Sequence, residues 1–296
     1  MSHSHHHDDV GDLRLAFFLN VGFAILEVFG GLLINSIAIL SDALHDLGDS
    51  ISLGLAWFLS GYSRKASDRR YSYGYRRFSL LGALINSIIL IGGSLFVLSE
   101  AIPRLQQPEA FDAPGMILFA IVGVVANGIA VLRLRGSQQL NTQVIGWHLI
   151  EDVLGWFVVL IVGVVSLFVD APILDPILSI LITLYILAHA LDNLRKSLAL
   201  FLQAAPQGID LAEIEGRLRD IDGVQSTHHT HVWSLDGEHN VLTTHLVVRE
   251  DAGKDDLIRI KRSVREAVED LSLEHLTIEL EYSDEDCSQE AAHFHR

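Results

Sequence analysis

Long apolar runs fill the first two thirds of the chain and stop near residue 200. A helix needs roughly 20 mostly apolar residues to cross the hydrocarbon core of a bilayer, and the runs reach that length. The pattern therefore predicts a multi-span α-helical membrane protein with six transmembrane helices. They are expected at about 13–33, 35–60, 78–101, 114–134, 143–168 and 173–192.

The last third of the chain has the mixed periods of a small α+β domain. Asp210 and Glu213 form a capping box ahead of an apolar helical face. A second amphipathic helix is predicted at about 254–271 from its apolar residues at helical spacing. Strand-like runs lie at 224–234, 241–249 and 275–282. Two helices packed on one small sheet would bury these faces most simply.

Charge divides the chain in the same place. Residues 205–296 hold 21 Asp and Glu against 9 Lys and Arg, which is −12 of the net charge of −16. Such acidity argues against a nucleic-acid partner and suits a cation. A lone cysteine, Cys287, excludes an internal disulfide and fits a reducing cytoplasm. The predicted division is a His/Asp-rich N-terminus at 1–12, which does not resemble a signal peptide, a transmembrane domain at 13–200, a metal-binding domain at 205–283 and a disordered tail at 284–296.

Basic residues flank only alternate loops between the predicted spans. Arg104 is the one basic residue in the opposite set. Because Lys and Arg are enriched on the cytoplasmic side, both termini are predicted to lie in the cytoplasm, with the protein in the cell (inner) membrane. The basic residues of the cytoplasmic set are Arg64, Lys65, Arg69, Arg70, Arg76, Arg77, Arg133, Arg135, Arg195 and Lys196.

The second predicted span carries charges that a lipid-facing helix would not tolerate. Asp42, Asp46 and Asp49 lie in it, and His45 lies among them. An acid near the centre of a membrane helix costs about 2.5–3.5 kcal/mol, so three acids cost on the order of 8–10 kcal/mol. The residues are therefore interpreted as functional, with buried hydrogen bonding between helices as the alternative.

Two His-x-x-x-Asp pairs point to a metal. His45 and Asp49 are four residues apart and leave the same helical face, and His148 and Asp152 repeat the spacing in the fifth span. Together they supply two imidazoles and two carboxylates, a complete tetrahedral shell for Zn²⁺. A closed shell leaves no position for a catalytic water, and no His-Glu-x-x-His helix is present, so an enzyme is not expected.

Other polar residues in the spans are weaker signals. Asp42, Asp46 and Glu151 lie beside the pairs, and a proton-carrying role and an outer supporting role are both open for them. The remaining four are interpreted as packing or helix-contact residues and not as ligands. They are Asn20, Glu27, Asn86 and His189.

These motifs resemble the cation diffusion facilitator family, over about residues 13–282 and in the same order. The resemblance rests on Ser41–Asp49, His148–Asp152, Tyr73–Phe78 and His228–Trp233. It implies a homodimeric metal/proton antiporter with a ferredoxin-like cytoplasmic domain that binds metal. The His-Asp/His-Asp site is similar to that of the family's zinc exporters, and the short loop at 135–142 favours a bacterial type.

The resemblance also implies ligands in the C-terminal domain. His228, His245 and Glu281 match the family's pattern, whereas His231 and Cys287 are left open as further ligands. In a regular strand His228 and His231 would point to opposite faces, so a shared ion requires a bend between them.

Two positions depart from the family pattern. Tyr71 and Tyr75 stand where many members carry the histidines of an accessory metal site with an aspartate, here Asp68, so that site is not carried over. Gln203 replaces an acid that pairs with a base near the third span, so this pairing with Arg76 or Arg77 is not expected.

The predicted function is export of a divalent transition metal from the cytoplasm by alternating access. Zn²⁺ is the expected substrate, with Cd²⁺, Co²⁺ or Fe²⁺ as alternatives, because the order of affinities is generic to such a site. Protons, the lipid bilayer and a second copy of the chain are the expected partners. A metal-gated channel or a membrane metal sensor using the same site is the alternative.

Overall fold

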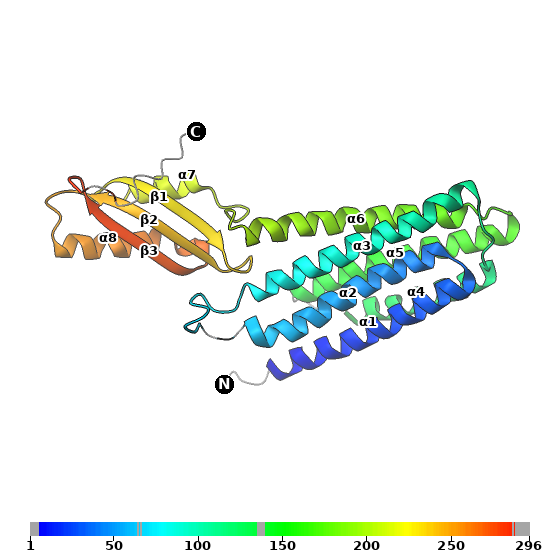
Figure 1. Cartoon of the computed structure of the whole chain (residues 1–296). Coiled ribbons are helices and arrows are strands. Elements are labelled where there is room, and N and C mark those ends of the chain that lie inside the picture. The colour runs from blue at the N-terminus through cyan, green and yellow to red at the C-terminus, as the bar shows by residue number, and fades with distance from the viewer. Residues whose placement is uncertain (1–5, 64, 66, 135–139, 286, 288–296) are drawn as a thin grey trace. The chain divides into compact units, whose positions relative to one another are not determined.

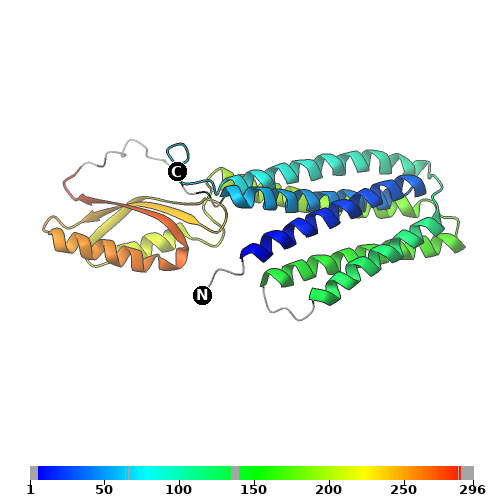
Figure 2. The same ribbon diagram turned by 90° about the horizontal axis from the view of Figure 1, so that it is seen from below.

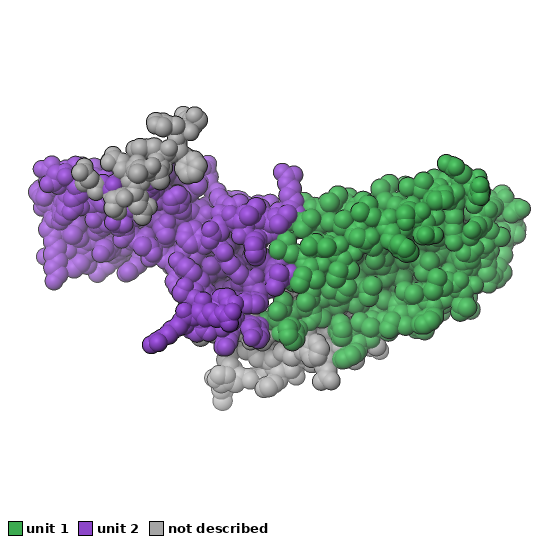
Figure 3. All heavy atoms as spheres, viewed as in Figure 1, with its two compact units in different colours: residues 1–61, 82–194 green, residues 62–81, 195–296 purple. Residues whose placement is uncertain are grey.

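The structure is a computed structural model that describes residues 6–63, 65, 67–134, 140–285 and 287. The chain forms two compact units (Figure 3). One comprises residues 1–61 and 82–194, and the other comprises residues 62–81 and 195–296.

Six long helices, which lie alongside one another, make up the first part of the described chain (Figures 1 and 2). Three of the described helices contain stretches long and apolar enough to cross a membrane, Phe78–Gln106, Ile150–Phe168 and Leu174–Phe201, and shorter apolar stretches lie at Asn20–Ile34 and Ala113–Ile129. The second helix carries the acids that interrupt its apolar character. The helices are α1 (His6–Ile34), α2 (Ile37–Ser63), α3 (Phe78–Gln106), α4 (Ala113–Leu134), α5 (Leu140–Phe168) and α6 (Leu174–Phe201).

Large apolar side chains cover the outside of the helical unit. Leu33 and Phe168 are 86% and 83% exposed, an arrangement that water disfavours and hydrocarbon accepts. Inside, α4 and α5 approach closely where Gly123 meets the indole of Trp156. Trp156 is 1% exposed and packs in a cluster with Met116 and Ile39.

The C-terminal unit contains the two helices and the small sheet expected from the sequence. Its strands are β1 (Val224–Ser234), β2 (Asn240–Val248) and β3 (Leu273–Tyr282), and its helices are α7 (Leu211–Arg219), α8 (Lys254–Ala267) and the short η1 (Glu269–Leu271). The sheet order is β1-β2-β3, with β1 antiparallel and β3 parallel to β2. The helices cover one face, where the apolar core lies, and leave the other face for polar residues (Figure 2).

A β-bulge changes which residues of β1 share a face. His228 pairs with His245, but three residues later His231 pairs with Thr243, only two residues back on β2. The extra residue is accommodated at His229, whose φ is 47°. His228 and His231 therefore point to the same face, and the bend required for that arrangement is present.

Residues 62–81 belong to the same unit as the sheet. Arg76 Nε lies 2.7 Å from Glu274 Oε2, and its Nη1 lies 3.6 Å from Asp236 Oδ2. The ring of Tyr73 lies 5.0 Å from that of His275. Arg76 thus makes ion pairs with acids at the edge of the sheet.

The close approach of α4 to α5 gives a test of the packing. Gly123→Ala adds a Cβ about 2.2 Å from the Trp156 ring, so we expect destabilisation by about 1–3 kcal/mol. The measurement is the thermal midpoint of the detergent-solubilised protein. Gly128→Ala on the same helix is the matched control, because its Cβ meets no atom within 4 Å and alanine favours the helix. Equal midpoints for the two variants would contradict the described packing.

Candidate metal centres

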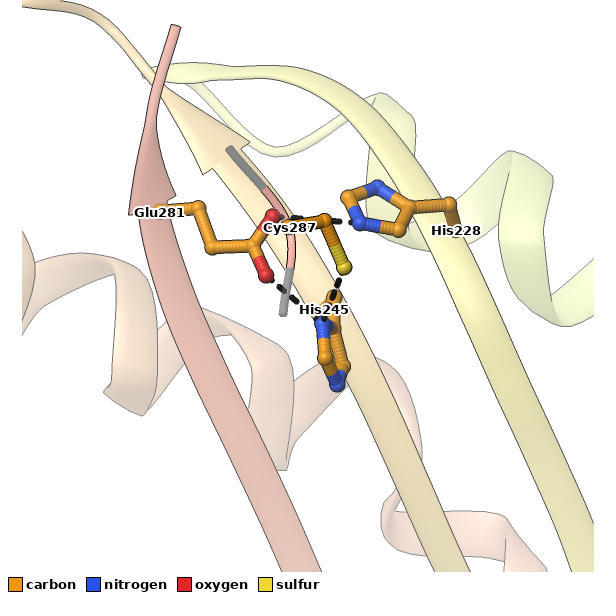
Figure 4. A group of neighbouring side chains, drawn as sticks. All are labelled: His228, His245, Glu281 and Cys287. Carbon is orange, nitrogen blue, oxygen red and sulfur yellow. Dashed lines mark hydrogen bonds and ion pairs between the residues drawn. The ribbon is translucent and has the colours of Figure 1, made fainter. Parts of the chain in front are cut away.

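Four ligand-type side chains converge on the polar face of the C-terminal sheet. Among the described residues, the donor atoms of His228, His245, Glu281 and Cys287 all lie within 4.8 Å of one another. The first three come from β1, β2 and β3, and Cys287 returns to the sheet after a turn that follows β3 (Figure 4). The resemblance implied His228, His245 and Glu281 as ligands and left Cys287 open, and the structure brings all four together.

Glu281 lies between the two histidines. Its Oε1 is hydrogen-bonded to His245 Nδ1 at 2.7 Å, and its Oε2 lies 3.1 Å from His228 Nε2. His228 Nε2 is buried and makes no aligned hydrogen bond to a described residue, although Glu281 Oε2 lies close to it. Cys287 Sγ lies 3.6 Å from His245 Nδ1.

The separations suit a tetrahedral ion. Zn²⁺ about 2.0–2.2 Å from nitrogen and oxygen and about 2.3 Å from sulfur holds N and O donors about 3.4 Å apart and N and S donors about 3.6 Å apart. Small shifts of Glu281 would open the space. Burial raises the pKa of the Glu281 carboxyl, but the hydrogen bond with His245 and the nearby His228 outweigh that effect, so the net pKa lies below its ordinary value. The Glu281 carboxyl is therefore ionised, which is the form that binds a metal.

Two further residues, which the sequence did not indicate, border this cluster. The ring of His229 lies 5.1 Å from that of His228 and 5.3 Å from that of His245. Glu279 Oε2 lies 3.3 Å from His245 Nε2. His231 shares the face but is outside the group, with its ring 6.5 Å from that of His229. His229 comes close to the cluster because of the bulge, and the bulge depends on the register between β1 and β2, which the sequence did not reveal.

The helical unit brings a second set of donors together. His45 Nε2 lies 3.7 Å from Asp49 Oδ2 on the same helix and 3.8 Å from Asp152 Oδ1 on α5. These separations are close to the roughly 3.4 Å that a tetrahedral Zn²⁺ requires between N and O donors. His148 belongs to α5, one turn before Asp152, but its side chain lies outside the described residues.

Polar residues near this set have structural contacts. Asn86 on α3 donates to Ser52 Oγ on α2 at 2.7 Å, and Asn20 on α1 donates to the carbonyl of Asp46 at 3.4 Å. The ring of His189 packs against Tyr185. Glu27 is fully buried on α1, and Asp46 is 8% exposed. Asn20 and Asn86 thus make the expected contacts between helices, whereas His189 packs against a residue of its own helix.

The loop before α3 uses Asp68 for hydrogen bonding. Its carboxylate accepts from the Tyr75 hydroxyl at 2.6 Å and from the backbone N–H groups of Arg70 and Tyr71 at 2.8 Å. The hydrogen bond from Tyr75 is the main cause that lowers the pKa of Asp68, and it raises the pKa of Tyr75 to about 12. With tyrosines in place of histidines, the loop closes on itself through these bonds.

Comparison with known proteins identifies related chains for both parts of the sequence. Residues 13–202 match the family description "Cation efflux transmembrane domain", and residues 206–282 match "Cation efflux protein, cytoplasmic domain". The zinc transporter ZitB of Escherichia coli is 34% identical over 295 residues, covering 95% of this chain and 93% of ZitB. The "Cadmium, cobalt and zinc/H(+)-K(+) antiporter" of Bacillus velezensis is 31% identical over 288 residues, covering 95% and 92%. The metal cation efflux system protein CzcD of Cupriavidus metallidurans is 30% identical over 301 residues, covering 99% and 95%.

The C-terminal cluster predicts a cobalt signature. Full-length protein carrying Asp49→Ala and Asp152→Ala, which removes the helical donors, should bind Co²⁺ with a thiolate-to-metal charge-transfer band from Cys287. Cys287→Ser should remove the band, and the triple change of His228, His245 and Glu281 to Ala should abolish binding altogether. His231→Ala is the control and should leave both signals intact. A band that persists in Cys287→Ser would exclude the cysteine as a ligand.

Proposed function

The chain belongs to the cation efflux family, the cation diffusion facilitators, and from that premise we propose that it exports Zn²⁺ from the cytoplasm in exchange for protons. Metal cation efflux is the activity of the family. The finer proposal concerns the ion, the site and the exchange. The observation that carries it is the convergence of His45 and Asp49 from α2 with Asp152 from α5.

The proposed transport site consists of His45, Asp49, His148 and Asp152. His148 is included because it precedes Asp152 by one helical turn on the same face. Two carboxylates balance the charge of a divalent ion, so the loaded site is neutral in surroundings of low dielectric constant. Neutral imidazoles complete the shell, which is a donor set that suits Zn²⁺.

The transport cycle follows from the two helices that carry the ligands. Zn²⁺ enters from the cytoplasm, displaces protons from the imidazoles of His45 or His148, and is bound by the two aspartates. The α2 and α5 pairs then reorient relative to one another and open the site to the other side. Protons rebind there as the ion leaves, because protonation and metal binding compete for the same nitrogen lone pairs.

Zn²⁺ is preferred over other ions for two reasons. The His and Asp donors suit a borderline-soft tetrahedral ion better than Mg²⁺ or Ca²⁺, which take oxygen ligands. Relatives named for zinc alone and for cadmium, cobalt and zinc are similar over nearly the whole chain. Cd²⁺, Co²⁺ and Fe²⁺ are alternative substrates of the proposed site.

The C-terminal domain is proposed to sense the cytoplasmic metal and to pair two copies of the chain. Its cluster of His228, His245, Glu281 and Cys287 supports a Zn²⁺ site that adds stability to the folded domain when the ion binds. The matched ranges support a division between transmembrane and cytoplasmic domains near residue 205. A homodimer in the inner membrane, with both termini cytoplasmic, completes the proposal.

A metal-gated channel or a membrane metal sensor is the second candidate, because either could use the same ligands. The transport rate of a carrier saturates with metal, and its proton exchange acidifies the compartment from which the metal is removed, whereas a channel shows neither effect. Metal and proton flux followed together in vesicles of purified protein separates these functions.

The transport site predicts the effect of removing one ligand at a time. Asp49→Ala, Asp152→Ala, His45→Ala and His148→Ala should each abolish Zn²⁺ uptake into inverted vesicles. Loss of an aspartate leaves the charge of the ion unbalanced in low dielectric, and loss of a histidine leaves its shell incomplete. His45→Asp should retain some transport and weaken the preference for Zn²⁺ over Cd²⁺ or Mn²⁺. Rates are scored against the amount inserted, with the exposed Asp170→Asn as control. Unaltered export by both aspartate variants would refute the site.

The proposed orientation has its own test. A reporter fused after Gly11, Ser137 or Arg296 should be cytoplasmic, and a reporter inserted near Gln107 or Ala171 should be external, because basic residues flank only the first set of positions. Alkaline phosphatase and fluorescent-protein fusions give complementary readouts. A periplasmic signal from the Arg296 fusion contradicts the orientation.

A further inference from the structure

The helix that carries His45 and Asp49 is capped by a residue from another helix. Asp175, in the first turn of α6, is 2% exposed. Its carboxylate accepts hydrogen bonds from the Ser36 hydroxyl at 2.5 Å and from the backbone N–H groups of Ile37 at 2.8 Å and Ala38 at 3.3 Å. Ser36 Oγ in turn accepts from Ile39 N at 3.2 Å. The first N–H groups of α2 are thus satisfied, and a carboxylate faces the positive end of its dipole.

The contact between α2 and α6 continues toward the ligands. Ser179 and Thr183 follow Asp175 at spacings of four, on one face of α6. The Ser41 hydroxyl lies 2.6 Å from that of Ser179 and 3.1 Å from that of Thr183, and all three side chains are fully buried. Ser41 precedes His45 by one turn, so this polar seam ends beside the proposed transport site.

The turn between α1 and α2 is held from other sides as well. Arg104 Nη1 on α3 donates to the Asn35 carbonyl at 3.2 Å, and Asn35 Nδ2 donates to the Ala110 carbonyl at 3.0 Å. Asp112 N donates to the Ile34 carbonyl at 2.9 Å. The turn is therefore tied to α3, to the α3–α4 connection and to α6, at the end of the helical unit where α6 begins (Figure 1).

We propose that Asp175 is a positioning residue for transport, which fixes one end of α2 so that the helix swings about the Ser36–Asp175 contact. This proposal rests on the transport function proposed above. His45 and Asp49 lie eight and twelve residues beyond Ile37, or about 12 and 18 Å at 1.5 Å per residue. A swing of about 10° about the fixed end displaces them by roughly 2–3 Å, a full metal–ligand bond length.

A role for Asp175 as a metal ligand does not fit its surroundings. Three donors already engage both of its oxygens, and all three belong to the beginning of α2. A carboxylate that accepts such bonds while buried is satisfied where it stands. Its effect on transport must therefore come through the position of α2.

The test uses the full-length protein reconstituted in vesicles. Asp175→Asn replaces an acceptor-only group with an amide whose NH₂ faces backbone donors, so we expect the maximal rate of Zn²⁺ transport to fall at least about ten-fold, since hydrogen bonds to charged groups are worth that much or more. The metal concentration for half-maximal rate and the equilibrium affinity of the helical site should stay within about two-fold. Asp170→Asn, near the same end and exposed, should transport normally.

Variants of Ser36 keep the proposal testable if Asp175→Asn fails to insert. Ser36→Ala should lower the maximal rate, and Ser36→Thr, which keeps the hydroxyl, should restore it. Ser36→Ala combined with Asp175→Asn should be no slower than Asp175→Asn alone within about two-fold, because both remove one contact.

Two results would overturn the proposal. One is a wild-type maximal rate in Asp175→Asn, or in Ser36→Ala if Asp175→Asn does not insert. The other is loss of metal affinity in either variant to the degree seen in Asp49→Ala. If the unaltered protein carried no Zn²⁺, the transport function itself would fail, and that outcome is distinct from either result.

Discussion

Carboxylates placed among apolar helices are the constraint on which the rest of this structure depends. Asp46, Asp49 and Asp152 lie within helices whose outer surfaces are hydrocarbon-like, and Glu27 is fully buried beside them. Charge in such surroundings requires partners or a bound cation. The proposed Zn²⁺ supplies that cation, and the donors sit at separations close to those that a tetrahedral ion imposes. In the proposed function, the charge that is costly for insertion is the feature that makes carriage of a divalent ion possible.

Movement of such a site requires that some contacts hold while others change. Polar bonds in a bilayer are well suited to holding, because water does not compete for them. In the described helices such bonds join Asp175 to the start of α2 and Arg104 to Asn35 in the turn before it. Apolar contacts, such as that of Trp156 with α4, lack this directional character. The proposed swing of α2 follows from this difference between polar bonds, which hold one end of the helix, and apolar contacts, which can shift.

The C-terminal domain assembles its candidate metal cluster by different means. The candidate ligands lie on three neighbouring strands and on the segment after β3, with the apolar core on the opposite face of the sheet. Arg76, from the segment before α3, joins the same unit through Glu274 and Asp236. These ion pairs connect the sheet to a segment that leads directly into α3.

The sequence by itself determined the elements and most of the candidate ligands. Apolar length predicted the helices, strict alternation placed Glu281 off the core face, and four-residue spacing paired His45 with Asp49, because these depend on local periodicity alone. The tertiary structure alone decided the rest. The bulge that turns His228 and His231 to one face, the approach of His229, the ion pairs of Arg76 and the cap from Asp175 each depend on strand register or helix contacts between residues far apart in the chain. No local pattern encodes such a contact, since it exists only when both segments have folded and packed.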